Sequence, residues 1–560
     1  MKKITLFLFA TLFSALSFAA LNPYAYGLKS DLSDDEKNVT LTYSLNADAT
    51  SVNIVILDGE TVVKTQTSTG TDQGTYSVEV STDGFPKGKT LSWKVEVKGT
   101  SVAAPTEHSK NHSFYHPSSI DIDNNPENET FGLLLVNDAM QKVKNATTHA
   151  DGSTYVASGF GAGIFAFNPA FELIPNGDAP GYNGGITFTT TRADGSGTAY
   201  APRRIRISDD GRIFVTSLNT DGVYLWEVNP ENMNEWTPIF KGTLNTEKEL
   251  VDNAGNFIAA PNNGFDVKGK GENLKLAMYS VNLKGIKEAT MSCFRLHEYN
   301  LGNATEWTTA PSKALVEGKY AINYTGTQVE YDNEGGFWIA SHRGGSASDA
   351  NPGLVHINAD GVEDAKLKWN YLQQAGIRFN KDFTKLVVAG TNGGSMSVTK
   401  KATVYTISKD ANGDPVLTEE VVVNMATVGA NLNDFAWDYA GNLYACGNSN
   451  EKLVAWAMPY SGTISTPCPS KHAFSLKTDP QLNPFAYNLT SELSADEKNL
   501  TINYSLNAKA TSVNWVLMDG NSVVKTIDLA SLGLEKGDYT TTISTTDFPQ
   551  YKQLTWKIEV

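Results

Sequence analysis

The sequence predicts an all-β protein in which a β-propeller of six blades, or of seven, lies between two homologous β-sandwich domains. Residues 21–65 and 482–526 are identical at 31 of 45 aligned positions, so one module occurs twice. Between the copies, a strand–turn–strand pattern recurs every 59 to 64 residues. In both regions apolar and polar residues alternate, as half-buried strands require.

The first 20 residues have the three parts of a secretory signal. Lys2 and Lys3 supply a positive start, and an apolar run follows from Ile4 to Phe18. Small residues near the end predict cleavage close to Ala19 or Ala20. The apolar run is short for a full membrane span. We therefore expect export to the periplasm, the cell surface or the medium, with no transmembrane span.

Composition excludes several classes of partner. The chain has 45 basic and 61 acidic residues, a formal charge of −16, which repels nucleic acid and anionic membrane surfaces. Its 560 residues exceed what one core holds, so several domains are expected. Cys293, Cys446 and Cys468 are too few for a disulfide framework, and Cys293 and Cys446 are expected as buried thiols.

The repeated modules span residues 21–99 and 480–560. Apolar residues alternate through Val39–Leu45, and the second copy repeats this alternation through Leu500–Leu506. Asp58 and Gly59 form a strong hairpin signal. About 80 residues of such strands predict a small Ig-like β-sandwich for each module.

The order of these strands resembles the FlgD-like Ig modules of exported bacterial proteins. In that family a strand ending in Tyr-Ser-Leu, here residues 43–45, precedes a polar loop, an alternating strand and an Asp-Gly hairpin. The closing strand departs from the family, because L-x-W-K-[VI]-E-V replaces G-x-Y-x-Y. The resemblance implies spacers or docking elements without catalysis. The domain order is similar to that of exported proteins of Bacteroidales-type bacteria.

A linker at residues 100–128 is expected to lead into the propeller at residues 129–475. Turn glycines at positions 152, 211, 271 and 335 are 59, 60 and 64 residues apart, and later units turn near Phe383 and at Gly441. About four strands in each unit predict a propeller. A seventh blade is expected if residues 131–136 form their own blade rather than closing the ring with the last one. The repeat style resembles NHL and SMP-30-like propellers more than WD40 repeats.

The expected ligand surface is the face made by the loops that enter each innermost strand and the loops between each second and third strand. Amide and arginine side chains there suit ligands rich in hydroxyl or carboxylate groups. The alternative, that these polar loops only solvate the face, stays open. The candidate binding residues are Arg203, Arg204, Asn219, Asp221, Asn263, Gln328, His342, Arg343, Gln374, Asn392, Asn433, Asp434 and Asn448.

Two weaker patterns concern metals, and neither predicts a bound metal or cofactor. A spacing of four would align metal ligands on a helix, but the polar stretch before Pro117 does not favour one; it carries His108, His112 and His116. A second run has the acidic spacing of a calcium loop but lacks its central glycine and terminal glutamate; it comprises Asp121, Asp123, Asn125 and Glu127.

Standard catalytic motifs are missing from the sequence, including H-E-x-x-H, G-x-S-x-G and the P-loop. The resemblance to SMP-30-like lactonases implies central metal ligands. Asn433 and Asp434 match part of such a set, without a matching glutamate. We expect a secreted or cell-surface binding or scaffold protein without catalysis, whose ligand is an extracellular glycan or protein. The alternative is a propeller hydrolase, lyase or lactonase acting on an extracellular carbohydrate.

Overall fold

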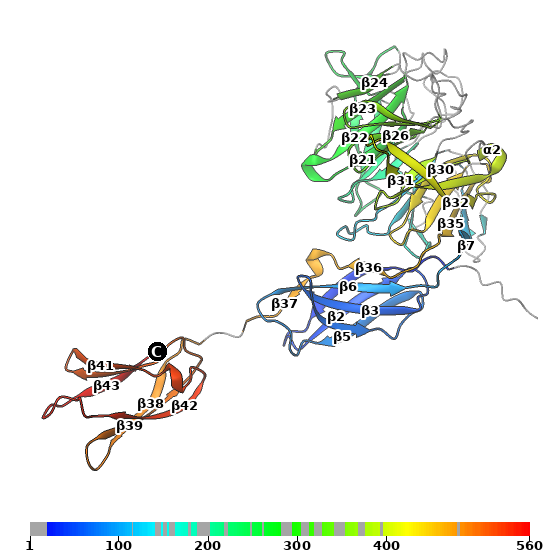
Figure 1. The fold of residues 1–560 in the computed structure, drawn as a ribbon. Helices are drawn as coiled ribbons and strands as arrows, with labels where there is room; N and C mark the ends of the chain where they lie inside the picture. The colour runs from blue at the N-terminus through cyan, green and yellow to red at the C-terminus, as the bar shows by residue number, and fades with distance from the viewer. Residues whose placement is uncertain are drawn as a thin grey trace, which may run out of the picture. The chain divides into compact units, whose positions relative to one another are not determined.

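The described part of the chain is almost entirely β-strand, and its α-helix is α2 (Met396–Thr399). Contacts divide it into two compact units, Met1–Gly84 with Thr90–Phe474 and Phe85–Lys89 with Ser475–Val560 (Figure 1). The computed structural model describes residues 20–114, 116–139, 147–148, 154–155, 163–176, 181–186, 202–217, 222–246, 249–259, 262–281, 294–303, 313–317, 328–340, 353–367, 376–391, 396–447, 449–478 and 482–560.

The first unit begins with a sandwich of two sheets. One sheet has the order β1-β2-β5 and the other the order β36-β6-β3-β4. The alternating residues predicted from the sequence point inward, so that every second residue of β2 and β6 is buried. The strands are β1 (Ala25–Leu32), β2 (Asn38–Leu45), β3 (Ser51–Asp58), β4 (Thr61–Thr67), β5 (Gly74–Ser81), β6 (Thr90–Lys98) and β36 (Ile464–Pro467).

Strand β36 comes from the far end of the central body and pairs antiparallel with β6. Ile464 faces Val97 and Pro467 faces Lys94, so the returning chain completes a sheet begun much earlier. Together with β37 (Phe474–Ser475), which also pairs with β6, β36 covers an edge that would otherwise be open. The short elements η3 (Ser470–His472) and β37 follow β36.

The central body contains six four-stranded antiparallel sheets among the described residues. Their members, from the axis outward, are β8 (Pro117–Ile122), β9 (Leu134–Asp138), β12 (Gly163–Phe167) and β13 (Leu173–Ile174); β14 (Ile205–Ile207), β15 (Ile213–Thr216), β16 (Val223–Val228) and β17 (Trp236–Lys241); β21 (Asn262–Lys268), β22 (Lys275–Val281), β23 (Phe294–Asn300) and β24 (Lys313–Glu317); β25 (Gln328–Tyr331), β26 (Phe337–Ala340), β27 (Leu354–Ile357) and β28 (Glu363–Leu367); β29 (Ile377–Phe379), β30 (Lys385–Ala389), β31 (Lys401–Lys409) and β32 (Pro415–Asn424); and β33 (Leu432–Trp437), β34 (Leu443–Gly447), β35 (Lys452–Ala457) and β7 (Thr106–Ser113).

These sheets form a closed ring. The innermost strands contact one another in the order β8, β14, β21, β25, β29 and β33, and β33 contacts β8 again. An apolar cluster fills each junction between neighbouring sheets, including the junction of the last sheet with the first. Each sheet thus buries both faces against its neighbours, which is the packing of a β-propeller.

Residues 100–128, predicted as a linker, contain two strands of the ring. Strand β7 is the outermost strand of the last sheet, and β8 is the innermost strand of the first. The prediction failed because β7 reads TEHSKNHS, which has no apolar alternation. The ring therefore closes by joining a strand from its beginning to the sheet at its end.

The beginning of the ring also differs from the sequence prediction. Residues 131–136 neither form their own blade nor close the ring, because β9 is the second strand of the first sheet. In the unit predicted to begin at His149, β12 is the third strand of the first sheet, and Gly152 lies outside the described residues. Two smaller sheets are insertions, formed by β10 (Thr147–Thr148) and β11 (Thr154–Tyr155), and by β18 (Thr243–Leu244), β19 (Leu250–Val251) and β20 (Phe257–Ala259).

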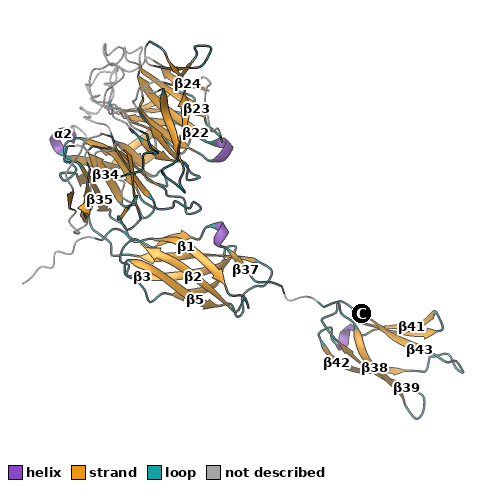
Figure 2. Ribbon diagram, turned by 180° about the vertical axis from the view of Figure 1, so that it is seen from behind, coloured by secondary structure: helices purple, strands orange, loops and turns teal. Residues whose placement is uncertain are grey.

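The second unit repeats the two-sheet arrangement (Figure 2). Trp515 and Tyr504 are buried in its core, which draws on both sheets. One sheet is β38 (Ala486–Leu493), β39 (Asn499–Leu506) and β42 (Gly537–Ser544), and the other is β41 (Ser522–Asp528), β40 (Asn514–Asp519) and β43 (Thr555–Glu559).

Cys446 and Cys468 are free, buried thiols. Cys293 and residues 1–19 of the predicted signal segment 1–20 lie outside the described residues. In the described part, no helix has the length and apolar character needed to cross a membrane.

Candidate functional site

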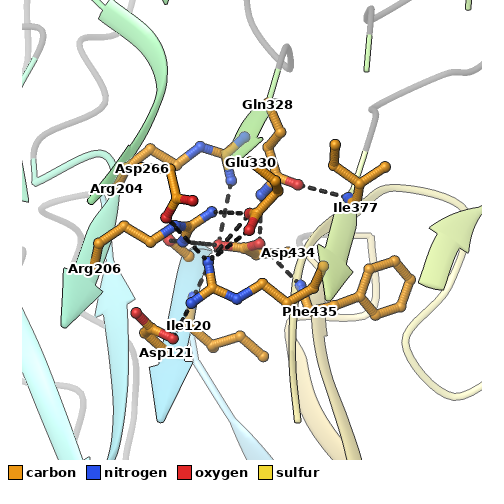
Figure 3. A network of polar contacts seen from close by, with 12 residues as sticks. Ile120, Asp121, Arg204, Arg206, Asp266, Gln328, Glu330, Ile377, Asp434 and Phe435 are labelled. Atoms are coloured by element: carbon orange, nitrogen blue, oxygen red, sulfur yellow. Dashed lines mark hydrogen bonds and ion pairs between the residues drawn. The ribbon is translucent and has the colours of Figure 1, made fainter. Parts of the chain in front are cut away.

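Five of the six innermost strands carry one charged residue at the same position near the axis. In each strand an apolar residue stands before and after it, as in Ile-Arg-Ile of β14 and Phe-Asp-Val of β21. The flanking residues pack between the sheets, while the charged side chains converge on the axis (Figure 3). In β33 this position is Ala436. The five charged residues, called here the axial ring, are Asp121, Arg206, Asp266, Glu330 and Arg378.

A second layer of polar side chains lies two residues before this position in four of the six sheets. It contains three residues that the sequence analysis assigned to ligand-binding loops, Arg204, Gln328 and Asp434, together with Ser119. All four are at most 1% exposed. The structure therefore corrects their placement, because Gln328 and Asp434 lie on innermost strands, Arg204 lies directly before β14, and all three are buried inside the ring rather than on open loops.

Asp434 connects the two layers. Its Oδ2 accepts hydrogen bonds from Arg206 Nη1 at 2.9 Å, and from Ser119 Oγ and the Ile120 N–H. Its Oδ1 accepts from the amide of Gln328. Burial alone would raise the pKa of Asp434, but the neighbouring guanidinium groups outweigh burial and hold the pKa below its usual value. Asp434 is therefore an ionised structural anchor.

Glu330 lies between two arginines of the axial ring. Its Oε1 is 2.9 Å from Arg206 Nη2 and 3.1 Å from Arg378 Nη1. Burial raises the pKa of Glu330 to about 8, against the opposing effect of the guanidinium groups. The two layers hold three guanidinium groups and four carboxyl groups, so a proton on Glu330 makes the buried cluster electrically neutral. The four carboxyl groups are those of Asp121, Asp266, Glu330 and Asp434, and the guanidinium groups are those of Arg204, Arg206 and Arg378.

The axial side chains also pair with the backbone. Each innermost strand is an edge of its sheet, and its N–H groups on the axial side have no strand to bond. Side chains of the preceding sheet in the ring accept these hydrogen bonds instead. The bonds run from the backbone N–H of Ile207 to Asp121 at 2.7 Å, of Tyr331 to Asp266 at 2.8 Å, of Ile377 to Gln328 at 2.7 Å, and of Ile120 to Asp434 at 3.3 Å.

A pocket of about 400 Å³ opens at one end of the axis. Its floor is formed by Asp121, Asp266, Glu330 and Arg378 of the axial ring. Its rim includes Asn124 and Asp209, in the turns after β8 and β14, and Lys268 at the end of β21. Asn124 donates through Nδ2 to the Trp437 carbonyl at 2.8 Å. Its Oδ1 is buried and has no hydrogen-bond partner in the part of the chain that the structure describes. This oxygen is thus an acceptor that the described residues leave unpartnered beside the pocket.

This pocket lies at the opposite end of the innermost strands from the predicted ligand face. Arg203 and Asn433 lie near the predicted face but are buried, at 4% and 6% exposure. Asn433 donates through Nδ2 to the Pro117 carbonyl and accepts from Arg204 through its own carbonyl. The Asn263 side chain and the residues Asn219, Asp221, His342, Arg343, Gln374, Asn392 and Asn448 lie outside what the structure describes.

Four residues of the axial ring were not among the predicted site residues, and Asp121 was assigned only to a run with calcium-like spacing. The four are Arg206, Asp266, Glu330 and Arg378. The available signal was the apolar–charged–apolar triplet, which occurs once in five of the six units. In an alternating strand, a charged residue between two apolar ones is predicted to face solvent. The sequence of one strand does not show that the closed ring buries this residue at the axis.

The two metal-like patterns have structural roles. His112 lies on strand β7 rather than a helix, contacts the rings of Phe167 and Phe171, and has Nε2 3.0 Å from the Phe171 carbonyl. Asp123 accepts hydrogen bonds from Asn128 and Thr130 within its own turn. Among the described residues, no group of three or more His, Cys, Asp or Glu side chains is placed to hold a metal.

A separate buried cluster lies in the fourth sheet. His356 on β27 has Nε2 2.7 Å from Asp332 Oδ2, and its Nδ1 contacts Asp364. Burial would lower the pKa of His356, but the two carboxylates outweigh burial and raise the pKa above its usual value. The imidazole therefore joins the turn after β25 to strand β28.

Comparisons with known proteins give a likeness of fold. No family model and no curated protein matches the chain. The WD40 β-propeller domain of Doa1 is 10% identical, with a TM-score of 0.34, and the match covers 64% of this chain and 96% of that one. A Trichoderma reesei carbohydrate-active enzyme of family AA12 is 14% identical, with a TM-score of 0.32 and coverage of 64% and 100%. These similarities are too low to carry a function, and the chain's resemblance to them ends at the β-propeller.

Proposed function

We propose that this chain is an exported binding protein without catalysis: a six-bladed propeller, flanked by two Ig-like spacer sandwiches, that holds an extracellular glycan in its axial pocket. The observation that supports this proposal is the pocket itself. Its volume of about 400 Å³ lies within the range of small-ligand sites. The signal-like segment at residues 1–20 supports export.

The chemistry of the rim favours a ligand rich in hydroxyl groups. The buried Oδ1 of Asn124 accepts a hydrogen bond, and the exposed carboxylate of Asp209 accepts others. Lys268 lies over the Phe383 ring at the same rim, so a donor and an apolar surface are side by side. A sugar ring presents hydroxyls and an apolar C–H face together, which matches this combination.

Binding is favoured over catalysis because the carboxylates of the floor are already engaged. Asp121 accepts from Arg378 and the Ile122 N–H through Oδ1, and from the Ile207 N–H through Oδ2. A general acid or base needs a free oxygen within hydrogen-bond reach of its substrate. The Asp121 oxygens are instead held by hydrogen bonds within the protein, which makes the floor of the pocket rigid.

One observation favours a second candidate, a hydrolase, lyase or lactonase acting on an extracellular carbohydrate. Glu330 lines the pocket with its pKa raised to about 8 by burial, as in carboxyl groups that act as general acids. Under this alternative, Glu330→Gln abolishes turnover of a bound glycan while leaving its binding in place.

The proposal is tested by screening the full chain on a glycan array and measuring affinity for the best ligand by calorimetry. Asn124→Ala and Lys268→Ala alter the rim, Arg343→Ala alters the predicted loop face, and Lys409→Ala is a surface control outside the pocket. We expect the two rim variants to lose at least tenfold in affinity, about 1.4 kcal/mol, and the control to bind as the wild type does.

Rim variants that bind normally while Arg343→Ala loses the ligand would move the site to the opposite face. Release of product from a bound glycan, lost in Glu330→Gln, would favour the enzyme. A wild-type chain that binds no glycan on the array but captures a protein through the loop face would replace the glycan by a protein ligand.

A further inference from the structure

The two sandwiches share a motif that is covered in one copy and exposed in the other. The motif is Leu-Asn-Pro-aromatic-Ala-Tyr followed by the first strand, at residues 21–28 and 482–489. Leu21 is 3% exposed, whereas its counterpart Leu482 is 62% exposed. Tyr24 is 1% exposed and Leu28 is 3% exposed; their counterparts Phe485 and Leu489 are 55% and 42% exposed. We call residues 482–489 the second-copy face.

In the first copy, the cover is a turn of the propeller. The backbone N–H of Asn22 donates to Asn442 Oδ1 at 2.7 Å, and Asn442 Nδ2 donates back to the Asn22 carbonyl at 3.0 Å. The ring of Tyr24 contacts those of Phe131 and Tyr439, each with 6.0 Å between centroids. The Asn442 side chain thus makes the two hydrogen bonds to Asn22 that a neighbouring strand would make. The rings of Phe131 and Tyr439 pack beside this contact against Tyr24.

A second part of the cover is the chain that returns from the propeller. Strand β36 pairs with β6, and η3 contacts β1, where the Ser30 hydroxyl donates to the His472 carbonyl at 2.7 Å. In the second unit, β43 takes the place of β6 at the end of its sheet, and no described strand pairs with its outer edge. An open strand edge is a template for a further strand.

The second-copy face already has the conformation of the covered copy. In the first copy, Asn46 Oδ1 accepts from the Tyr24 N–H at 2.6 Å, and Asn46 Nδ2 donates to the Asn22 carbonyl at 3.3 Å. In the second copy, Asn507 makes the same two bonds, to the Phe485 N–H at 2.7 Å and to the Asn483 carbonyl at 3.3 Å. Preorganisation of this kind reduces the entropy that binding costs.

We infer that the second sandwich docks a further propeller-type domain through the second-copy face and the β43 edge. That partner would carry an aromatic turn with an asparagine, like Tyr439–Asn442 here, and an extended strand to pair with β43. We infer these features of the partner from the propeller turn and the strand β36 that cover the homologous first sandwich. The propeller of a second copy of this chain is excluded as the preferred occupant because its own first sandwich already covers the matching turn.

The test uses full-length chains and a probe whose own propeller turn is vacated. The probe carries Leu21→Ser and Tyr24→Ser, which detach its first sandwich, and Leu482→Ser and Phe485→Ser, which remove its own second-copy face. Mixed with the wild-type chain, the probe is expected to form a one-to-one complex in sedimentation velocity. Asn442→Ala in the probe is expected to weaken that complex at least tenfold.

The matched control is the wild-type chain with only Leu482→Ser and Phe485→Ser, which should form no complex with the probe. Absence of a complex at 100 µM of each chain, about 5.5 kcal/mol of binding free energy, would overturn the inference if the probe's ring keeps its unfolding midpoint. Wild-type chains that dimerise on their own, and stop doing so in the control, would assign the face to a second copy instead.

A second arm covers the case in which the probe fails to fold. In a chimeric full chain, residues 482–560 replace residues 21–97, so that the second-copy face stands next to the propeller in the same chain. Slow hydrogen exchange of the amide that corresponds to Asn483 supports the inference, since this amide then bonds Asn442. Exchange as fast as in the wild-type second sandwich would contradict it.

Discussion

Asp434 is the single residue on which the axis depends most directly. Its carboxylate is fully buried and bonds Arg206, Ser119 and two backbone N–H groups. Asp434→Asn removes the carboxylate that lies 2.9 Å from Arg206 Nη1, and it turns one acceptor oxygen into an amide group that faces other buried donors. We expect the free energy of unfolding of the ring to fall by about 3–5 kcal/mol, measured from the denaturant midpoint.

The matched control for Asp434→Asn is Asp360→Asn, in an exposed turn. This control should change stability by no more than about 0.5 kcal/mol. Equal midpoints for the two variants would mean that Asp434 is not an ionised anchor.

His356 gives the molecule a pH dependence of known sign. Because its folded pKa is raised, its stabilising effect is fully present below the unfolded pKa of about 6.5 and is lost as the pH rises through the folded value. We expect His356→Gln to lower the melting temperature most near pH 6 and least near pH 9. Melting curves of both chains over this range check the prediction, and parallel profiles would contradict it.

Single residues also show where sequence reasoning stops. Arg204, Gln328 and Asp434 were predicted as binding residues because they are polar and lie next to turns. Polarity and position do not distinguish an exposed loop from a closed axis, because burial there depends on the whole ring. The triplets that carry Arg206 and Asp266 were visible in the sequence, but their common position follows only from the alignment of the innermost strands.

At the scale of elements, side chains replace the missing strand at each axial edge. Asp266 on β21 accepts the Tyr331 N–H of β25 at 2.8 Å. Asp266→Leu removes this acceptor, and the Tyr331 amide is expected to exchange at least tenfold faster, about 1.4 kcal/mol, within the cost of an unmet buried donor. Asp266→Asn keeps an acceptor oxygen, so the Tyr331 amide should exchange more slowly in this variant than in the leucine variant. Hydrogen-exchange mass spectrometry of both variants measures this difference.

Prediction of elements succeeded where alternation is strong and failed where a strand is polar. Strands β2 and β6 follow the predicted alternation because one face of each is buried. Strand β7 has a polar sequence, since it is the outermost strand of its sheet, and it was read as a linker. The first sheet was misassigned because an insertion separates its second and third strands.

At the scale of the whole molecule, β7 couples the two ends of the ring. Asn111 and His112 face Val454 and Leu453 on β35, and the N–H groups of adjacent residues point to opposite sides of a strand. The double substitution Asn111→Pro and His112→Pro therefore removes at least one donor that faces β35. We expect faster hydrogen exchange in both the last sheet and the first, because the apolar cluster between them is shared.

The control for β7 is a pair of prolines at Ser522 and Val523 in β41, an edge strand of the second unit. Exchange should then rise only within residues 482–560. Rapid exchange confined to β35 in the β7 variant would show that closure of the ring is local rather than cooperative.

The pairing of β36 with β6 also determines how the molecule carries mechanical load. Residues 99–463, which include the whole ring, form a loop whose two ends are held together by this ladder. Tension applied between residue 21 and residue 478 passes through the first sandwich and across the ladder, so the ring is shielded from stretching. A stretched chain must therefore peel β36 away from β6 before residues 99–463 can lengthen.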